Sequence, residues 1–124
     1  MKELDSFLEK IEKLMDENGH YKFEAYSFVM AALHHTVSKL KKARHVSGKE
    51  LLEGIREYAI DQFGPYTLTV LNHLGVKETL DFGKIVFALV EAGVLRKQPE
   101  DKLEDFKDVY EFKKAFGKGN KTKE

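Results

Sequence analysis

The chain has 124 residues, with 21 basic and 21 acidic side chains, five histidines and no cysteine. This length corresponds to one domain that can bury a hydrophobic core of its own. The absence of cysteine excludes a disulfide scaffold, a thiolate metal site and a cysteine nucleophile. A net charge of zero argues against a globally basic nucleic-acid binder and against a polyanion mimic.

Two amphipathic helices are predicted in the N-terminal third of the chain. Apolar residues recur at spacings of three and four over residues 4–15 and form one helical stripe, and Asn18 followed by Gly19 is a typical stop signal. A broader apolar stripe predicts a second helix over about residues 21–42. Because this stripe covers about half of the helix circumference, the second helix is expected to lie at the centre of the core.

The clearest local signal marks the start of a third helix. Ser47 and Glu50 have the spacing of a capping box, in which each side chain accepts a hydrogen bond from the other residue's backbone N–H. Val46 and Leu51 stand at the two positions of a hydrophobic staple. The apolar stripe then continues to Phe63, where a Gly-Pro pair ends the helix and restarts the chain.

The second half of the chain resembles a winged helix-turn-helix in the order of its elements. A short helix over residues 68–74 is followed by a turn and by a longer helix that ends at Gly93. A strand at Val94–Lys97 and a returning segment at Phe106–Val109 would then form a β-hairpin wing. The alternative interpretation is two amphipathic helices with a glycine C-cap, which occur in any helical protein.

The predicted fold class is therefore mainly α. We expect one compact domain over residues 1–116, with about five helices, in which residues 65–112 form the winged-helix-like half with its small β-hairpin. Residues 117–124 contain no apolar residue and several lysines, which predicts a disordered basic tail.

The charge of the winged-helix-like half argues against sequence-specific DNA binding. Residues 65–112 carry six basic and nine acidic side chains. A recognition helix needs basic or amide side chains that reach bases and phosphates. The polar positions at and after the start of the expected recognition helix are mostly acidic, and Lys84 is the one basic residue among them. DNA phosphates would repel such a face.

Two sequence blocks carry a family resemblance. They are RHVSGKELLEGIRE at residues 44–57, with FGP at 63–65, and DFGKIVFALVEAG at residues 81–93, with EDF and VY downstream. They resemble an uncharacterised family of small bacterial cytosolic proteins of unknown function. The resemblance implies a bacterial, cytoplasmic protein and supplies no reaction, cofactor or catalytic residue.

A basic cluster next to the third helix is the best candidate for a binding site. Lys41, Lys42, Arg44 and His45 lie just before the helix N-terminus, where backbone N–H groups attract anions. These residues are predicted to bind an anion or a partner, such as a phosphate-bearing ligand or an RNA backbone. The alternative is structural, because Ser47 and Glu50 already satisfy those N–H groups.

No linear motif for catalysis or metal binding is present. The five histidines lack the spacing of ligands on one helix face, and no Ser-His-Asp order, carboxylate pair or phosphate loop stands out. Asp81-Phe82-Gly83 matches the kinase metal triplet, but the other kinase motifs are absent and the chain is too short. Asp81 is better interpreted as a helix N-terminal residue. No cofactor and no metal are predicted.

The leading functional prediction is a non-catalytic protein-interaction or adaptor module. Its partner is an unknown protein, and a homodimer with a second copy of the chain is one form that such an interaction can take. The first alternative is a nucleic-acid-associated protein that uses the basic patch Lys39–His45 and the C-terminal tail. The second is a small enzyme or metal-binding protein whose site is not a linear motif. No apolar run is long enough to cross a membrane, and no secretory signal is visible, so a cytoplasmic location is expected.

Overall fold

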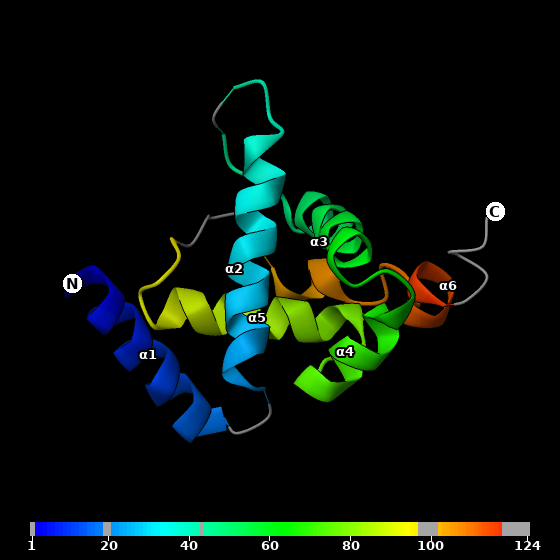
Figure 1. The fold of residues 1–124 in the computed structure, drawn as a ribbon. Helices are drawn as coiled ribbons and strands as arrows, with labels where there is room; N and C mark the ends of the chain where they lie inside the picture. The colour runs from blue at the N-terminus through cyan, green and yellow to red at the C-terminus, as the bar shows by residue number, and fades with distance from the viewer. Residues whose placement is uncertain (1, 19–20, 43, 97–101, 118–124) are drawn as a thin grey trace.

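The computed structural model describes residues 2–18, 21–42, 44–96 and 102–117, with the backbone alone for residues 2–4 and 18. Its α-helices and 3-10 segments are α1 (Lys2–Asn18), α2 (Phe23–Ser38), α3 (Gly48–Phe63), η1 (Gly64–Tyr66), α4 (Thr67–Leu74), α5 (Thr79–Glu91), η2 (Leu103–Phe106) and α6 (Phe112–Phe116). This arrangement, shown in Figure 1, confirms the mainly α fold.

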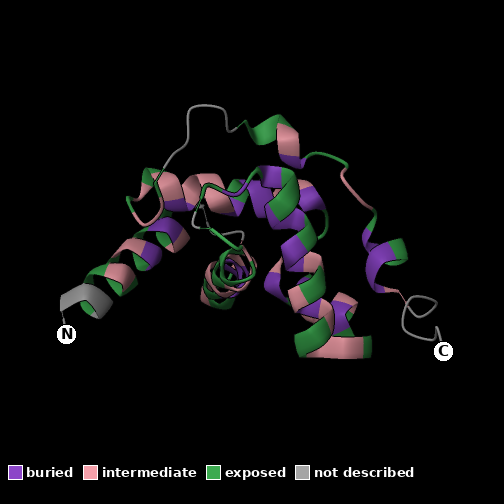
Figure 2. Cartoon of the chain, turned by 90° about the horizontal axis from the view of Figure 1, so that it is seen from above, coloured by how far each residue is buried: buried purple, intermediate pink, exposed green. Residues whose placement is uncertain are grey.

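Helix α2 lies at the centre, as its broad apolar stripe predicts. It packs most extensively on α3 and crosses α5, while α1 lies at one end of the molecule and α6 at the other (Figure 1). Buried residues gather where these helices meet (Figure 2). Phe28 of α2 stands at this meeting point, because its ring centroid lies 5.5 Å from that of Phe63 and 6.4 Å from that of Phe82.

Helices α2 and α3 approach closely at one glycine. Thr36 of α2 donates a hydrogen bond from its Oγ1 to the carbonyl of Ala32 at 2.8 Å, so its side chain is fixed against its own helix. A Cβ atom at Gly54 of α3 would overlap the Oγ1 and Cβ atoms of Thr36. The two helices can therefore reach this separation only because position 54 carries no side chain.

Helix α2 ends earlier than the sequence predicts. The backbone N–H groups of Lys39 and Leu40 bond to the carbonyls of Thr36 and Val37 at 3.3 and 3.0 Å, which tightens the last turn and ends the helix at Ser38. The expected helix over about residues 21–42 is therefore about four residues too long at this end. Lysines 41 and 42 lie beyond the helix instead of in its last turn.

Helices α4 and α5 are joined by a short turn, as predicted. Gly75 closes α4 in the left-handed conformation, with φ of 90°, and Gly93 follows α5 with φ of 83°. After α5, the N–H groups of Gly93 and Val94 bond back to Val90 and Leu89 at 3.0 and 2.9 Å. These bonds form a glycine C-cap of the Schellman type.

The predicted β-hairpin is wrong for the residues that the structure describes. No strand occurs among them, residues 94–96 are irregular, and the returning segment forms the 3-10 turn η2. Thr79 of α5 explains this difference, because its buried Oγ1 donates to the carbonyl of Phe106 at 2.6 Å and accepts from the N–H of Val109 at 3.2 Å. The segment therefore bonds to α5 and not to a strand. Residues 97–101, which contain the end of the first predicted wing strand and part of the wing loop, and 118–124, most of the predicted disordered tail, lie outside the described residues.

The C-terminal aromatic residues close the core. Phe112 and Phe116 are buried, and their ring centroids lie 5.2 Å apart. The hydroxyl of Tyr110 donates to the carbonyl of Leu52 in α3 at 2.8 Å. Burial is the main reason that the pKa of this hydroxyl is raised. It stays protonated and ties the C-terminal segment to α3.

Candidate partner-binding groove

An apolar groove lies at the junction of α2, α3, α5 and η2. Its volume is about 220 Å³. The apolar side chains that line it come from four separate parts of the chain and are Leu33, Val37, Val46, Leu51, Val86, Val90, Leu95 and Phe106. Val37 is 38% exposed, so apolar surface at this groove is open to solvent.

Phe106 is the aromatic side chain of the groove, and two glycines make room for it. A Cβ atom at Gly83 of α5 would lie 2.6–2.9 Å from the Cγ, Cβ and Cδ1 atoms of Phe106. At Gly48, the first residue of α3, a Cβ atom would lie 3.1 Å from the same ring. Phe106 is 3% exposed and its ring meets that of Phe87 edge to face. The segment predicted to be a wing therefore contributes a buried side chain to this site.

The rim of the groove is basic. Among the residues that the structure describes, Arg44, His45 and Arg96 are the charged or titratable lining residues, all three are exposed, and no acidic side chain lines the groove. Arg44 makes a two-pronged ion pair with Glu50, with Nη1–Oε1 and Nη2–Oε2 distances of 3.0 and 2.8 Å. Arg44 also donates to the carbonyl of His45 at 3.0 Å. These contacts fix the guanidinium beside the apolar lining.

The structure divides the four residues that the sequence singles out. It places Arg44 and His45 on the rim of the groove, whereas Lys41 and Lys42 are exposed beyond the end of α2 and do not line it. The capping box of α3 is present, with Ser47 Oγ accepting from the N–H of Glu50 at 3.1 Å. The capping box and the Arg44–Glu50 pair already engage the backbone N–H groups and the guanidinium that the predicted anion would contact. Anion binding by the four residues stays a prediction.

From the sequence, Leu95 and Arg96 are predicted to lie in the wing strand, and the apolar residues of α2 and α5 that line the groove are interpreted as helix stripes. Val86 and Val90 are four residues apart on α5 and therefore share a face, but only half-burial distinguishes them from the fully buried Ile85 and Leu89. One signal for the groove was available in the sequence. The apolar stripe is wider than a single neighbouring helix can cover, so part of it is expected to stay accessible.

The pH dependence of stability tests the geometry of the rim. The hydrogen bonds from Arg44, followed by the backbone hydrogen bond of Ser47, lower the pKa of Glu50 from its ordinary 4.5 to about 2. Because this pKa is depressed in the folded state, the stability that it contributes is present above 4.5 and is lost as the pH falls toward 2.

We therefore expect Glu50→Gln to lower the thermal midpoint at neutral pH and to converge with the wild type as the pH falls from 4.5 to 2. Arg44→Gln, which removes the partner, should show the same convergence. Thermal unfolding followed by circular dichroism across this pH range measures it. A constant offset between wild type and variant down to the lowest pH would contradict the ion pair.

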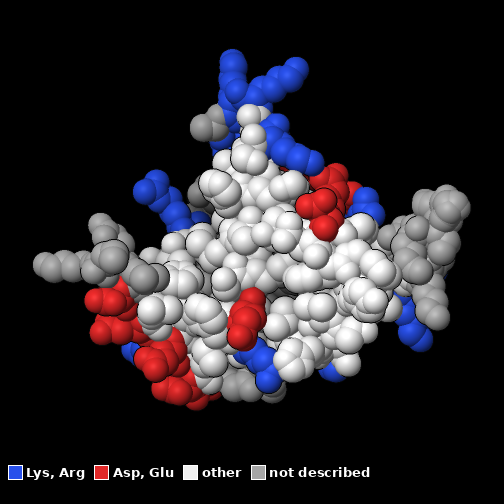
Figure 3. Space-filling model, viewed as in Figure 1, with Lys and Arg blue, Asp and Glu red and all other residues white. Residues whose placement is uncertain are grey.

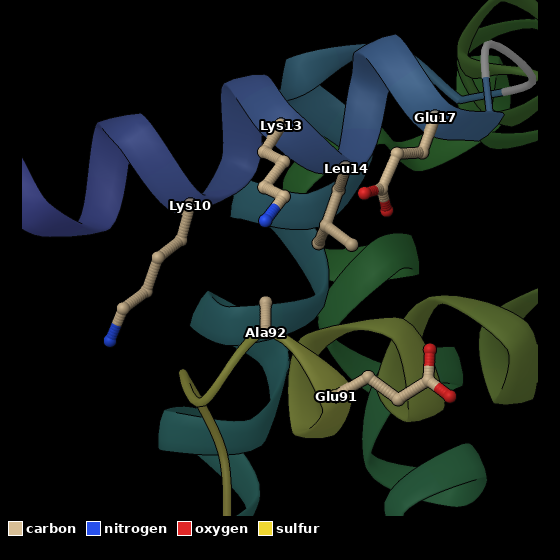
Figure 4. A pocket seen from close by; sticks show the side chains of 6 residues that line it. All are labelled: Lys10, Lys13, Leu14, Glu17, Glu91 and Ala92. Carbon is tan, nitrogen blue, oxygen red and sulfur yellow. The ribbon is translucent and has the colours of Figure 1, made fainter.

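A second cavity, of about 520 Å³, lies between α1 and the end of α5. Figure 4 shows Lys10, Lys13, Leu14 and Glu17 on α1, facing Ala92 and Glu91. Its charged lining consists of two lysines and two glutamates. The lining therefore carries no net charge that would select a ligand of one sign.

Asp81 lies in the first turn of α5, as predicted, and caps the helix. One carboxylate oxygen accepts from the N–H groups of Lys77 and Glu78 at 2.8 and 3.2 Å, and the other accepts from the hydroxyl of Tyr21 at 2.6 Å. Burial, and then this hydrogen bond, raise the pKa of Tyr21. Within the described ranges, no three His, Asp or Glu residues are grouped as metal ligands.

Comparison with protein-family models, curated proteins and solved structures finds no significant match. Among the helices whose residues are described, none is long and apolar enough to span a bilayer.

Proposed function

We propose that the chain is a non-catalytic protein-interaction module whose groove binds a partner segment with an apolar side chain flanked by acidic residues. One observation supports this function above the others, namely an apolar groove whose charged or titratable lining residues, within the described ranges, are Arg44, His45 and Arg96. Apolar lining provides the binding free energy, and the rim selects partners of complementary charge.

The size of the groove favours a protein partner over a small substrate. Its volume of about 220 Å³ lies below the roughly 300–1,000 Å³ that is typical of small-molecule sites. A cavity of this size suits one or two side chains of a partner, which is how anchor residues bind in protein interfaces. The enzyme or metal-binding alternative stays a prediction without a supporting arrangement of side chains.

The test uses a short synthetic helical peptide with a central leucine and glutamates one turn before and after it. We expect it to bind the chain, and Val37→Glu to weaken binding by about tenfold through like-charge repulsion and lost apolar contact. Leu103→Glu is the matched control, because Leu103 is also 38% exposed and does not line the groove. Fluorescence anisotropy of the labelled peptide measures both variants.

Two further peptides sharpen this experiment. Replacing the glutamates by lysines should weaken binding by about tenfold if the basic rim selects the partner. Replacing the leucine by serine should abolish measurable binding if the groove supplies the affinity. Equal binding by all three peptides, or equal effects of Val37→Glu and Leu103→Glu, would refute the proposed site.

The charge distribution favours nucleic-acid association as a second candidate function. Lys and Arg side chains gather at the end of the molecule that follows α2 (Figure 3), in the patch Lys39–His45. Lys39 pairs with Glu57 at 3.1 Å and Arg44 with Glu50, so part of this charge is already balanced. Binding to RNA that weakens steeply with salt would support this candidate, and binding that is indifferent to salt would remove it.

Two predictions about family and location stay proposals, namely the resemblance to a bacterial family and the cytoplasmic location.

The winged-helix character of the α4–α5 pair also stays a proposal. For α5 as a recognition helix, the acidic residues Glu78 and Asp81 at its start oppose DNA binding. We therefore propose that α4 serves the fold and that α5 serves both the fold and the groove.

A further inference from the structure

We infer that the ligand of the groove is helix α1 of a second copy of this chain. The inference rests on the proposed function, because it takes the groove to be a binding site for an apolar side chain with acidic neighbours. It adds the identity of the partner. Helix α1 carries an exposed apolar side chain beside acidic residues, which are the features that the groove is proposed to bind.

Helix α1 presents an acidic stripe beside an exposed leucine. Asp5, Glu9, Glu12 and Asp16 follow one another at helical spacings of four, three and four residues, and all four are exposed. Leu8 stands at the edge of this stripe, three residues after Asp5 and four before Glu12. It is 41% exposed, the largest exposed fraction of any aliphatic side chain that the structure describes.

A second molecule can bind the exposed edge of α1 while α1 stays packed on its own core. Ile11 and Leu14 are 0% and 5% exposed, so they hold α1 on its own core. Leu8 lies on the same apolar stripe but at its margin, where the chain's own core leaves it accessible. A second molecule can therefore contact Leu8 and the acidic stripe together.

Charge complementarity supports this pairing over a partner of unknown sequence. Asp and Glu side chains gather over α1 and Lys and Arg side chains gather at the far end of α2 (Figure 3). The described side chains of α1 include five acids and two lysines, all exposed but Lys10, whereas the rim of the groove carries Arg44, His45 and Arg96. Two copies in opposite orientation bring these surfaces into contact, with an attraction that salt weakens.

Sedimentation equilibrium of the full chain over a concentration series tests the inference. We expect the wild type to self-associate, and Leu8→Glu and Arg96→Glu each to weaken association by about tenfold or more. Both positions are exposed, so neither change should alter the thermal midpoint by more than a surface substitution does. Leu103→Glu, exposed to a similar degree as Leu8 and not among the residues that line the groove, should associate like the wild type.

Mixing the two variants gives the sharpest result. The Leu8→Glu chain retains an intact groove and the Arg96→Glu chain retains an intact α1, so the mixture should associate more strongly than either variant alone. A wild type that is monomeric at millimolar concentration would overturn the inference. So would variants that associate like the wild type, or a mixture no stronger than its components.

The peptide experiment separates this inference from the proposed function. If the chain stays monomeric but binds the acidic leucine peptide at the groove, the second-copy ligand is wrong and the interaction module stands. If the peptide also fails to bind, both are wrong. Self-association that Leu8→Glu abolishes and Val37→Glu does not would show a dimer that does not use the groove.

Discussion

Phe106→Ala is expected to lower the free energy of unfolding by about 3–5 kcal/mol, the usual cost of removing a buried aromatic ring. Phe106 is 3% exposed, and its ring fills the space that Gly48 and Gly83 leave open. Neither glycine can move a side chain into the resulting cavity, so the loss should lie toward the upper end of this range. Chemical denaturation with urea measures the change.

Leu103→Ala is the control for this prediction. Leu103 belongs to the same 3-10 turn but is 38% exposed, so its truncation should cost less than about 1 kcal/mol. A small effect of Phe106→Ala, similar to that of Leu103→Ala, would mean that η2 does not pack on α5. The groove would then lose its aromatic side chain, and the proposed function would lose its site.

Gly54→Ala is expected to destabilise the fold by about 1–3 kcal/mol, although the same exchange in an open helix interior stabilises by about 1 kcal/mol. The sign reverses because a Cβ atom at this position would overlap Thr36 Oγ1 and lie 2.9 Å from Thr36 Cβ. Thr36 cannot rotate away without losing its hydrogen bond to Ala32. The helices would have to separate.

A double-mutant cycle tests this account of the α2–α3 contact. Thr36→Gly removes the atoms that a Cβ at position 54 would meet, so Gly54→Ala should become neutral or stabilising in that background. Urea denaturation of the four proteins gives the coupling free energy. Additive effects of the two substitutions would show that they do not meet across the helix interface.

The local features of the fold were predictable because they depend on neighbouring residues. The Ser47–Glu50 capping box and the glycine at the end of α4 follow from side-chain chemistry within one turn of helix, and both are confirmed. The central place of α2 also followed from the width of its apolar stripe.

The wing was not predictable because a long-range contact decides it. The pattern around Phe106 allows a strand, but Thr79, 27 residues earlier, takes its carbonyl into a buried hydrogen bond. Nothing near Phe106 in the sequence signals this partner. Local propensity gave way to a tertiary contact, as it does for many short segments.

The groove was only half predictable for the same reason. Arg44 and His45 stood out because they precede a marked helix start, whereas Arg96 joins them only through the packing of α5 on α2. The zero net charge also concealed the pattern that matters. Acidic side chains gather over α1 and basic side chains at the end of α2, and the fold places these two groups at different ends of the molecule (Figure 3).

Methyl nuclear magnetic resonance of the chain with the acidic leucine peptide tests binding at the groove residue by residue. We expect the methyl signals of Val37, Val86, Val90 and Leu95 to shift together on titration, because these groups line one groove. The methyl signals of Leu68 and Leu103, outside the groove, should stay in place. Shifts at these remote methyls with an unchanged groove, or no shifts at saturating peptide, would contradict the account.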